Sequence, residues 1–354
     1  MGKIPAHRSA VTLRDVAEQV GITASAASMA LSDSSRISEK TKTLVRAAAA
    51  ELGYVPSSAA RALRNQRAGA VALIVPNTTR HVFGHSYFMH VLTGVSSVAN
   101  DRDTQVLVST NSDEANGLAA YERVMRSKSA DGAIVTSAAV TDPYVERLSQ
   151  SGLPVVLIGN FPYLPDSITV GIDDVAAEAA ITRHLIEVHG TKRLMHVSGP
   201  LDHQTAIDRR DGFLAAVAEA GLLESSLVVE GDFSEDAGWQ AVRSLGQGIR
   251  DIDGIVFAND DMAFGGLEAL TDQGLTVPGD VAIVGFDDFG LSRLTTPSIT
   301  TVSVPAEDLA RVATERLFDI IDGVNDGPAH QRLPVSLTLR SSCGCVPKGA
   351  QPHR

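Results

Sequence analysis

Apolar positions near the N-terminus recur at the spacing of amphipathic helices. The pattern predicts three helices, over residues 12–20, 23–31 and 38–52. Thr12 and Asp15 have the spacing of a capping box at the first helix start, and Gly21 supplies a tight turn after that helix. The third helix carries one apolar stripe, made of Leu44, Val45, Ala48, Ala49 and Leu52. Three helices in so short a stretch indicate a small bundle.

The segment that follows is rich in helix formers but poor in apolar surface. Pro56 suits the entry to a helix, and residues 57–68 hold too little apolar surface to fold alone. We therefore expect a hinge helix that forms only under particular conditions.

From Ala70 onward, short β-rich runs alternate with helical stretches. The runs are VALIV, QVLVST, DGAIVT, PVVLIG, RLMHVS, SLVVEG, GIVFAN and VAIVGF. This alternation predicts parallel sheets built from βαβ units. Two groups of strands exceed one sheet, so two lobes facing a cleft are expected, with a crossing near residues 166–171. Residues directly after VALIV, PVVLIG, RLMHVS and GIVFAN should line that cleft, because ligands of such sheets bind at the carboxyl ends of strands.

Charge is divided unevenly along the chain. The whole sequence carries a net charge of −12. Residues 1–67 hold ten Lys and Arg against five Asp and Glu, so this part is +5 and the remainder is −17. A basic head on an acidic body is expected when only one end meets nucleic-acid phosphates, although a solvated surface of mixed charge would give the same split.

Composition gives little sign of a membrane segment, a disulfide or a metal. No apolar run approaches the roughly 18 residues of a membrane span and the N-terminus has no apolar signal segment, so we expect a cytoplasmic protein. Cys343 and Cys345 are too few and too close for a disulfide framework. They could form half of a metal site, but no partner pair of Cys or His is evident, and we expect no metal and no cofactor. Three histidines of one region are interpreted as loop and surface residues, namely His81, His85 and His90.

The segment TLRDVAEQVGITASAASMALSDSSRISEKTKTLVRAAAAELGYVPSSAARALR resembles, nearly position for position, the DNA-binding head and hinge of the lactose and galactose repressor family. DGAIVT, RRDGF, FANDDMAFG and VAIVGFDDFGLSRLTTPSITTVSVP are similar to that family's sensor domain. The resemblance implies an N-terminal all-α helix-turn-helix head and an α/β two-lobed, periplasmic-binding-protein-like sensor with parallel sheets. The expected domains are a head at 10–56, a hinge at 57–68, an effector-binding and dimerisation domain at 69–345 and a polar tail at 346–354.

The resemblance also implies a function, that of a transcriptional repressor and not of an enzyme. A homodimer would bind double-stranded operator DNA, and a small effector, a sugar or a nucleoside-like molecule, would change its affinity for that DNA. Whether the effector releases or tightens DNA stays open. The tail lacks Leu heptads, so a dimer is expected and not a tetramer.

Candidate DNA contacts follow from the geometry of a helix-turn-helix, whose second helix presents its first residues to the major groove. Those residues are Ala24, Ser25, Ser28 and Met29. The family commonly has an Arg at Met29, so the strong contact of Arg with guanine is absent, and Ala24 and Met29 could pack on thymine methyls. The other matching positions are Thr12, Leu13, Ser38, Thr41, Tyr54, Ala60 and Leu63. The hydroxyl groups among them would contact phosphates, and Leu63 would enter the minor groove and unstack a base step.

Candidate ligand contacts come from both lobes. Asp260 follows the strand GIVFAN and matches the family's ligand aspartate, although a plain helix cap would look the same. Arg209 offers a rigid fork of donors, and Phe233 offers a stacking platform. Tyr87 and Phe88 match an aromatic pair on the other lobe.

Two departures from the family affect this site. The loop from Asn77 to Ser86 is about five residues longer than the usual family form, which puts the contacts of the first lobe in doubt. Gly159 stands where many relatives carry an acid, so the corresponding hydrogen bond is either missing or supplied by Asn160.

Two other classes of protein fit less well. A periplasmic binding protein shares the two-lobed sensor but needs an export signal and has no use for a helix-turn-helix. An enzyme on a Rossmann-like scaffold would show a motif such as GxGxxG after the first strand, GxxxxGK[ST], GxSxG or HExxH, and the sequence has none of these.

Overall fold

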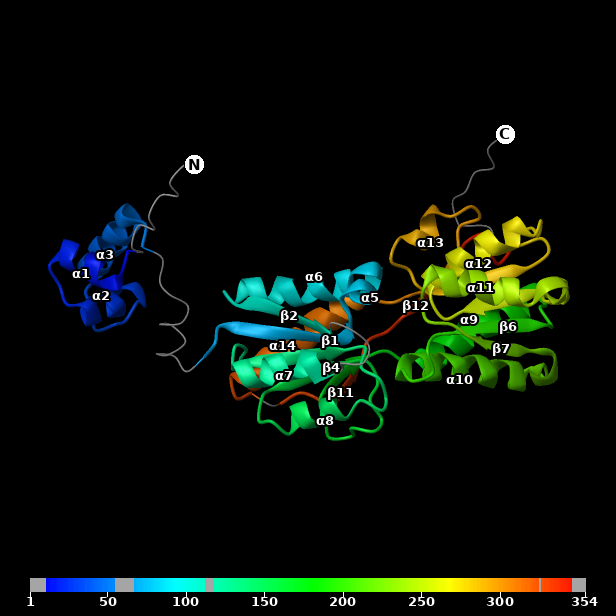
Figure 1. Cartoon of the computed structure of the whole chain (residues 1–354), viewed down its shortest axis with the longest axis horizontal. Coiled ribbons are helices and arrows are strands. Elements are labelled where there is room, and N and C mark those ends of the chain that lie inside the picture. The colour runs from blue at the N-terminus through cyan, green and yellow to red at the C-terminus, as the bar shows by residue number, and fades with distance from the viewer. Residues whose placement is uncertain (1–10, 55–66, 112–117, 325, 346–354) are drawn as a thin grey trace, which may run out of the picture. The chain divides into compact units, whose positions relative to one another are not determined.

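The computed structural model describes residues 11–54, 67–111, 118–324 and 326–345. The chain divides into two compact units, one ending at Ala68 and the other beginning at Gly69, and each is described on its own (Figure 1). Two residues of the expected hinge, Ala60 and Leu63, lie outside the described residues, as does the tail from residue 346.

The first unit contains the three predicted helices. They are α1 (Leu13–Val20), α2 (Ala24–Leu31) and α3 (Glu39–Leu52). The capping box is confirmed: the Asp15 amide donates to the Thr12 hydroxyl, and the Thr12 amide donates to the Asp15 carboxylate at 2.7 Å. Gly21 ends α1 at a φ of +71°, a left-handed conformation that glycine adopts without steric cost.

The core of this unit is small and rich in alanine. It consists of Val16, Ala17, Ala27, Ala30, Val45, Ala48 and Ala49. Leu44 does not belong to it, because its side chain is 52% exposed. The predicted stripe was wrong there: Leu44 precedes Val45 by one residue, which turns it roughly 100° around the helix and away from the core.

The second unit, which begins at Gly69, has two sheets, and each is the centre of one lobe. The sheet of the first lobe has the order β11-β5-β4-β3-β1-β2 and pairs its strands in parallel. Its strands are β1 (Ala70–Thr78), β2 (Gln105–Asn111), β3 (Gly132–Thr136), β4 (Val155–Ile158), β5 (Thr169–Gly171) and β11 (His330–Arg332). The sheet of the second lobe has the order β12-β10-β9-β8-β6-β7, with only β12 antiparallel to its neighbour. Its strands are β6 (Leu194–Ser198), β7 (Leu227–Glu230), β8 (Gly254–Phe257), β9 (Ala282–Asp287), β10 (Thr300–Ser303) and β12 (Ser336–Thr338).

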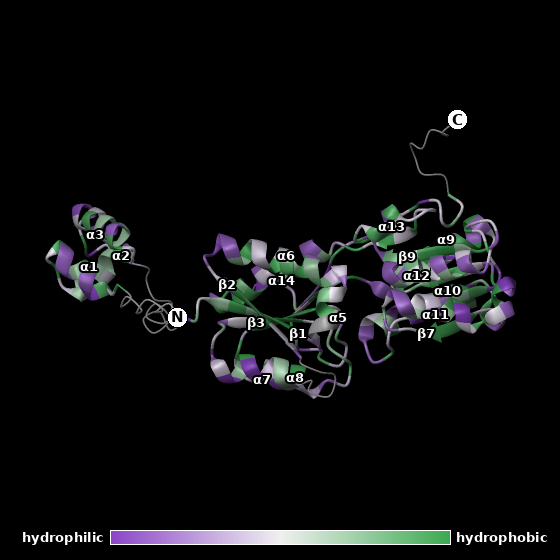
Figure 2. Ribbon diagram, turned by 45° about the horizontal axis from the view of Figure 1, so that its top comes forward, coloured by the Kyte–Doolittle hydropathy of each residue, from purple (hydrophilic) through white to green (hydrophobic). Residues whose placement is uncertain are grey.

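Helices cover both faces of each sheet. In the first lobe, α6 (Ser86–Asp101) packs on α14 (Ala306–Ile321), while α7 (Leu118–Ser127) and α8 (Pro143–Ser149) cover the opposite face (Figure 1). In the second lobe, α9 (Asp174–His189) packs on α10 (Gln204–Glu219), and α11 (Glu235–Ser244) packs on α12 (Asp260–Asp272). The strands between these layers are predominantly hydrophobic, whereas the outer helix faces are polar (Figure 2). This is the layering expected of a parallel sheet whose two faces are buried.

The chain crosses between the lobes at three places in the described part. It passes to the second lobe after β5, returns after β10, and passes again between β11 and β12. The first crossing lies a few residues later than the one predicted near residues 166–171. The reason is that β5 still pairs within the first sheet up to its last residue, Gly171. Three segments of the described chain therefore connect the two lobes.

Short helices complete the second unit. They are α5 (Thr79–Gly84), α13 (Leu291–Leu294) and two 3-10 turns at Leu223–Ser225 and Gly246–Asp251. Helix α5 lies within the segment, Asn77 to Ser86, that was expected to be a loop longer than the usual family form. None of the helices in the described residues combines the length and the apolar character needed to cross a bilayer.

Candidate ligand-binding site

A cavity of about 130 Å³, continuous with a larger space that is open to solvent, lies between the two lobes. Residues at the carboxyl ends of four strands line it, namely Ser137 after β3, Gly159 after β4, Asn259 after β8 and Asp287 at the end of β9. Helix α10 of the second lobe adds Gln204, Thr205 and Arg209. The cavity is therefore placed where open parallel sheets bind ligands.

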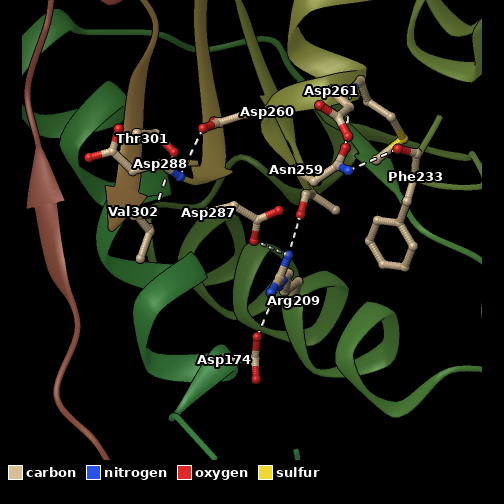
Figure 3. Close-up of polar contacts among 12 residues, drawn as sticks. Asp174, Arg209, Phe233, Asn259, Asp260, Asp261, Asp287, Asp288, Thr301 and Val302 are labelled. Carbon is tan, nitrogen blue, oxygen red and sulfur yellow. Dashed lines mark hydrogen bonds and ion pairs between the residues drawn. The ribbon is translucent and has the colours of Figure 1, made fainter. Parts of the chain in front are cut away.

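Arg209 is the central cation of the cavity and is 7% exposed. Its Nε donates to Asp174 at 2.9 Å, and its NH1 donates to the carbonyl of Ala258 and lies 3.5 Å from Asp287 (Figure 3). The guanidinium also lies over the ring of Phe286, with 3.7 Å from Cζ to the ring centroid. These contacts fix the planar group in one orientation, so its remaining donors have a defined direction.

Burial and charge set the protonation behaviour of this cluster. Burial raises the pKa of Asp174 to about 6, although Arg209 opposes the shift. Burial likewise raises the pKa of Asp287 well above its ordinary range. The two carboxylates outweigh the effect of burial on Arg209 and raise the pKa of its guanidinium. The charge of Arg209 is thus already neutralised within the protein.

Aromatic side chains form the apolar part of the wall. Tyr87, Phe88 and Phe161 come from the first lobe, and Phe233 comes from the second. Phe233 has a φ of +67°, and its carbonyl accepts a hydrogen bond from Asn259 at 2.8 Å. A Cβ at Gly199 would lie 2.1 Å from the Phe233 ring, so only glycine leaves room for it. A strained backbone held by such contacts is typical of a functional position.

Polar contacts cross the cavity from one lobe to the other. Asn160 donates to Asp208 of α10 at 2.8 Å, and His85 lies 3.2 Å from Asp261 of α12. Tyr87 also contacts both lobes: its hydroxyl is 2.9 Å from that of Thr136 in its own lobe, and its ring lies 6.1 Å, centroid to centroid, from that of Phe289 in the other. Burial raises the pKa of Tyr87 to about 12. The cross-lobe pairs would have to break when the lobes separate.

The N-terminal unit presents a second candidate surface. Ala24 and Ser25 at the start of α2 are exposed, whereas Ser28 and Met29 are half-buried. Thr12 and Ser38 cap α1 and α3, and the Ser38 hydroxyl lies 2.9 Å from that of Thr41. Leu13 and Tyr54 pack against the small core. The start of α2 is thus free to meet another molecule.

Known proteins resemble the chain over nearly its whole length. Residues 12–57 match the family model "Bacterial regulatory proteins, lacI family", and residues 182–343 match "Periplasmic binding protein-like domain". The HTH-type transcriptional regulator CelR of Thermobifida fusca is 31% identical over 341 residues, which are 95% of this chain and 99% of CelR. The chain belongs to the lacI family.

Other relatives and structures agree with this membership. The ribose operon repressor of Halalkalibacterium halodurans is 30% identical over 94% of this chain and 96% of its own. The structure of a transcriptional regulator CelR–cellobiose complex matches with a TM-score of 0.71 and 29% identity over 94% of this chain and 99% of that one. A lac repressor dimer bound to operator and the anti-inducer ONPF shares the fold, with a TM-score of 0.83, 24% identity and coverage of 95% and 99%. As a lacI-family protein, the chain is a DNA-binding transcriptional regulator that responds to a small effector.

One expectation drawn from the lacI family requires correction. Asp260 is not among the residues that line the cavity and is 4% exposed. Its carboxylate accepts the Asp288 amide at 2.9 Å and packs over Gly285, where a Cβ would lie 2.3 Å from it (Figure 3). The next residue, Asp261, lines the cavity instead. The side chains of consecutive residues at a helix start point about 100° apart. Asp260 therefore points into the protein, whereas Asp261 points into the cavity.

Among the polar residues of the cavity that sequence reasoning missed are its three acidic residues, Asp174, Asp261 and Asp287. Asp287 carried a usable signal, since it follows VAIVGF, a strand end that the cleft prediction left out. The other predicted contacts, Tyr87, Phe88, Asn160, Arg209 and Phe233, all line the cavity. Helix α5, in the segment expected to be longer than the usual family form, leads into His85, which forms one side of the cross-lobe pair with Asp261.

Proposed function

We propose that the cavity binds a neutral mono- or disaccharide, which changes the affinity of a homodimer for operator DNA. The observation that carries this proposal is the environment of Arg209. Its charge is shared between Asp174 and Asp287, so the cavity offers directed hydrogen bonds without a net positive charge. An anionic effector would find no free cation there.

The walls of the cavity suit the two kinds of surface that a sugar ring presents. Phe233, Phe161 and Tyr87 offer aromatic faces for the C–H face of a ring. Asp261, Gln204 and Asn259 offer polar groups for hydroxyls at its rim. The cellobiose in the related CelR complex is an effector of this class.

The N-terminal unit would bind the operator through α2. Ala24 and Ser25 would face base edges, with Ser28 and Met29 beside them, while Thr12, Ser38, Thr41 and Tyr54 would lie along the phosphates. Leu13 would support α1, and Ala60 and Leu63 would enter the minor groove. We assign DNA binding to residues 10–56, the hinge to residues 57–68, and effector binding and dimerisation to residues 69–345. The protein would act in the cytoplasm, where operator DNA is, and would release its effector chemically unchanged.

Calorimetric titration of the full-length protein tests the effector class. We expect binding of cellobiose, glucose or ribose, and none of gluconate or glucose 6-phosphate. Phe233→Ala should weaken binding by roughly tenfold or more, since one stacked ring contributes about 1.5 kcal/mol. Trp239→Ala, on α11 outside the cavity, is the control and should bind as the wild type does.

Two results would count against the sugar proposal. Binding of the anions without the neutral sugars would mean that Arg209 is available as a free cation. Binding of adenosine alone would favour a nucleoside effector. Recovery of a chemically altered sugar after incubation would contradict the non-enzymatic assignment.

A further inference from the structure

Four side chains with metal-ligating atoms converge in the second lobe, away from the effector cavity. His184 and His189 come from the last part of α9, and Cys343 and Cys345 come from the turn at the end of the described chain. Their four ligand atoms all lie within 4.8 Å of one another. None of the four residues lines the effector cavity.

The distances match those of a tetrahedral metal site. The two histidine Nε2 atoms are 3.2 Å apart, and the Cys345 sulfur lies 3.4 Å from His189 and 3.5 Å from His184. The Cys343 sulfur lies 3.6 Å from His184. Tetrahedral zinc, with bonds of about 2.0–2.1 Å to nitrogen and about 2.3 Å to sulfur, separates two nitrogens by about 3.3 Å and nitrogen from sulfur by about 3.5 Å.

Hydrogen bonding alone accounts poorly for this arrangement. Neutral imidazole donates one proton, and a thiol is a weak donor and a weak acceptor. Here both Nε2 atoms face each other and face the Cys345 sulfur at the same time. A cation at the centre would satisfy all four groups together.

The surrounding backbone holds the four groups in place. Gly344 between the cysteines has a φ of +99°, and a Cβ there would lie 3.2 Å from Nδ1 of His189. The Ser342 hydroxyl donates to the Ile283 carbonyl at 2.7 Å and accepts the Thr300 amide at 2.9 Å, which ties the turn to β9 and β10. The Thr300 hydroxyl also lies 3.0 Å from the Cys343 sulfur. A ligand supported by a neighbouring donor is usual in built metal sites.

We propose that His184, His189, Cys343 and Cys345 bind one Zn²⁺ ion in a structural site that tethers the C-terminal turn to α9. Two nitrogens and two sulfurs in a tetrahedron are a donor set that zinc prefers. Four protein ligands leave no open position for a water or substrate, so the site is structural and not catalytic. Binding releases the two thiol protons, because zinc coordinates thiolates.

With zinc bound at the proposed site, α9 would be anchored at both ends. Asp174, the first residue of α9, pairs with Arg209 in the effector cavity, and His189, its last residue, is a zinc ligand. The helix spans 16 residues, or about 24 Å. Zinc would thus fix the far end of the helix that positions the buried arginine.

Metal analysis of full-length protein, expressed without a histidine tag and purified in a reducing, zinc-containing buffer, tests the proposal. After dialysis we expect one zinc per chain by plasma mass spectrometry. The Cys343→Ser, Cys345→Ser double variant and His184→Ala should lose it. His90→Ala is the matched control, because that ring packs on Phe289 outside the cluster, and it should keep the metal.

Spectroscopy on the wild-type protein covers the case in which the variants fail to fold. Cobalt exchanged into the site should give the intense visible bands of a tetrahedral thiolate complex. X-ray absorption at the zinc edge should show two sulfur neighbours at about 2.3 Å and two nitrogen neighbours at about 2.0–2.1 Å. A strong chelator should lower the melting temperature of the wild type and leave that of a folded double-cysteine variant unchanged.

Three outcomes would overturn the proposal. Wild-type protein that retains no zinc under these conditions would show that the cluster does not hold the ion. Zinc retained equally by the double-cysteine variant would place the metal elsewhere. A mass lower by two hydrogen atoms in zinc-saturating buffer would mean that Cys343 and Cys345 form a disulfide instead.

Discussion

Single carboxylates decide much of the chemistry of the second unit. Asp174 and Asp260 are buried and Asp287 is half-buried, and each has a different environment. Asp174 and Asp287 neutralise Arg209, whereas Asp260 accepts the Asp288 amide and holds the end of β9 against α12. An uncompensated buried charge is costly, so the position of each proton matters for stability.

The protonation of Asp260 makes the stability of the second unit depend on pH. Burial raises its pKa from an ordinary value of 3.8 to about 7 in the folded protein. The folded state therefore binds more protons than the unfolded state between these values, and the free energy of unfolding falls as pH rises through about 4 to 7. We expect Asp260→Asn, whose amide carbonyl still accepts the Asp288 amide, to remove this fall.

Denaturant unfolding at several pH values checks this prediction. The stability difference between the variant and the wild type should widen in favour of the variant from pH 4 to 7, by at most about 4 kcal/mol at 1.36 kcal/mol per pKa unit. Asp272→Asn, at the exposed end of the same helix, is the control and should change little. Parallel curves for Asp260→Asn and the wild type would show that Asp260 is ionised throughout.

At the scale of elements, close helix packing depends on a few glycines. Gly94 on α6 lies against α14, where a Cβ would sit 2.2 Å from the Glu307 carbonyl and 2.8 Å from Ala310. Both contacts involve rigid parts of a facing helix, so neither can yield without separating α6 from α14. We expect Gly94→Ala to destabilise the protein by about 1–3 kcal/mol through overpacking.

Thermal unfolding of Gly94→Ala beside Gly84→Ala separates packing from helix propensity. A Cβ at Gly84 on α5 would meet nothing within 4 Å, so that variant should be neutral or slightly more stable. Equal melting temperatures for the two variants would mean that the α6–α14 contact relaxes without cost.

Elements with a clear apolar pattern were predictable, and elements without one were not. The three helices of the first unit and eight strands of the second unit are confirmed. Strands β5, β10, β11 and β12 are short and mostly polar, so no apolar run marks them in the sequence, whereas β4, β7 and β8 are equally short but apolar. Helix α5 was foreseen only as an inserted loop.

The residues of the candidate site were likewise predictable only in part. Residue type and chain position identified Arg209 and Phe233, which line the cavity. They could not distinguish Asp260 from Asp261, because that choice depends on the exact helix start. The histidine partners of Cys343 and Cys345 lie more than 150 residues earlier in the chain, so only the fold brings them together.

At the scale of the whole molecule, the effector and the operator must both act on one conformational equilibrium, that between two arrangements of the lobes. The effector cavity lies between lobes that contact each other through Asn160 and Asp208 and through His85 and Asp261. An effector that binds one lobe arrangement better than another shifts the population of both arrangements. The typical coupling of about 1–3 kcal/mol would change operator affinity by roughly 5- to 150-fold.

Linkage makes this coupling reciprocal, which gives a quantitative prediction. The factor by which saturating effector changes the operator dissociation constant must equal the factor by which saturating operator changes the effector dissociation constant. Fluorescence anisotropy with labelled operator and calorimetry with effector measure the two factors independently, at one salt concentration because phosphate contacts make operator affinity depend on salt. Phe233→Ala should raise the effector concentration required but leave the saturated factor nearly unchanged, because Phe233 lines the cavity and takes no part in the two cross-lobe polar pairs. Unequal factors in the wild type would mean that a further equilibrium, such as dissociation of the dimer, is linked to one ligand and not to the other.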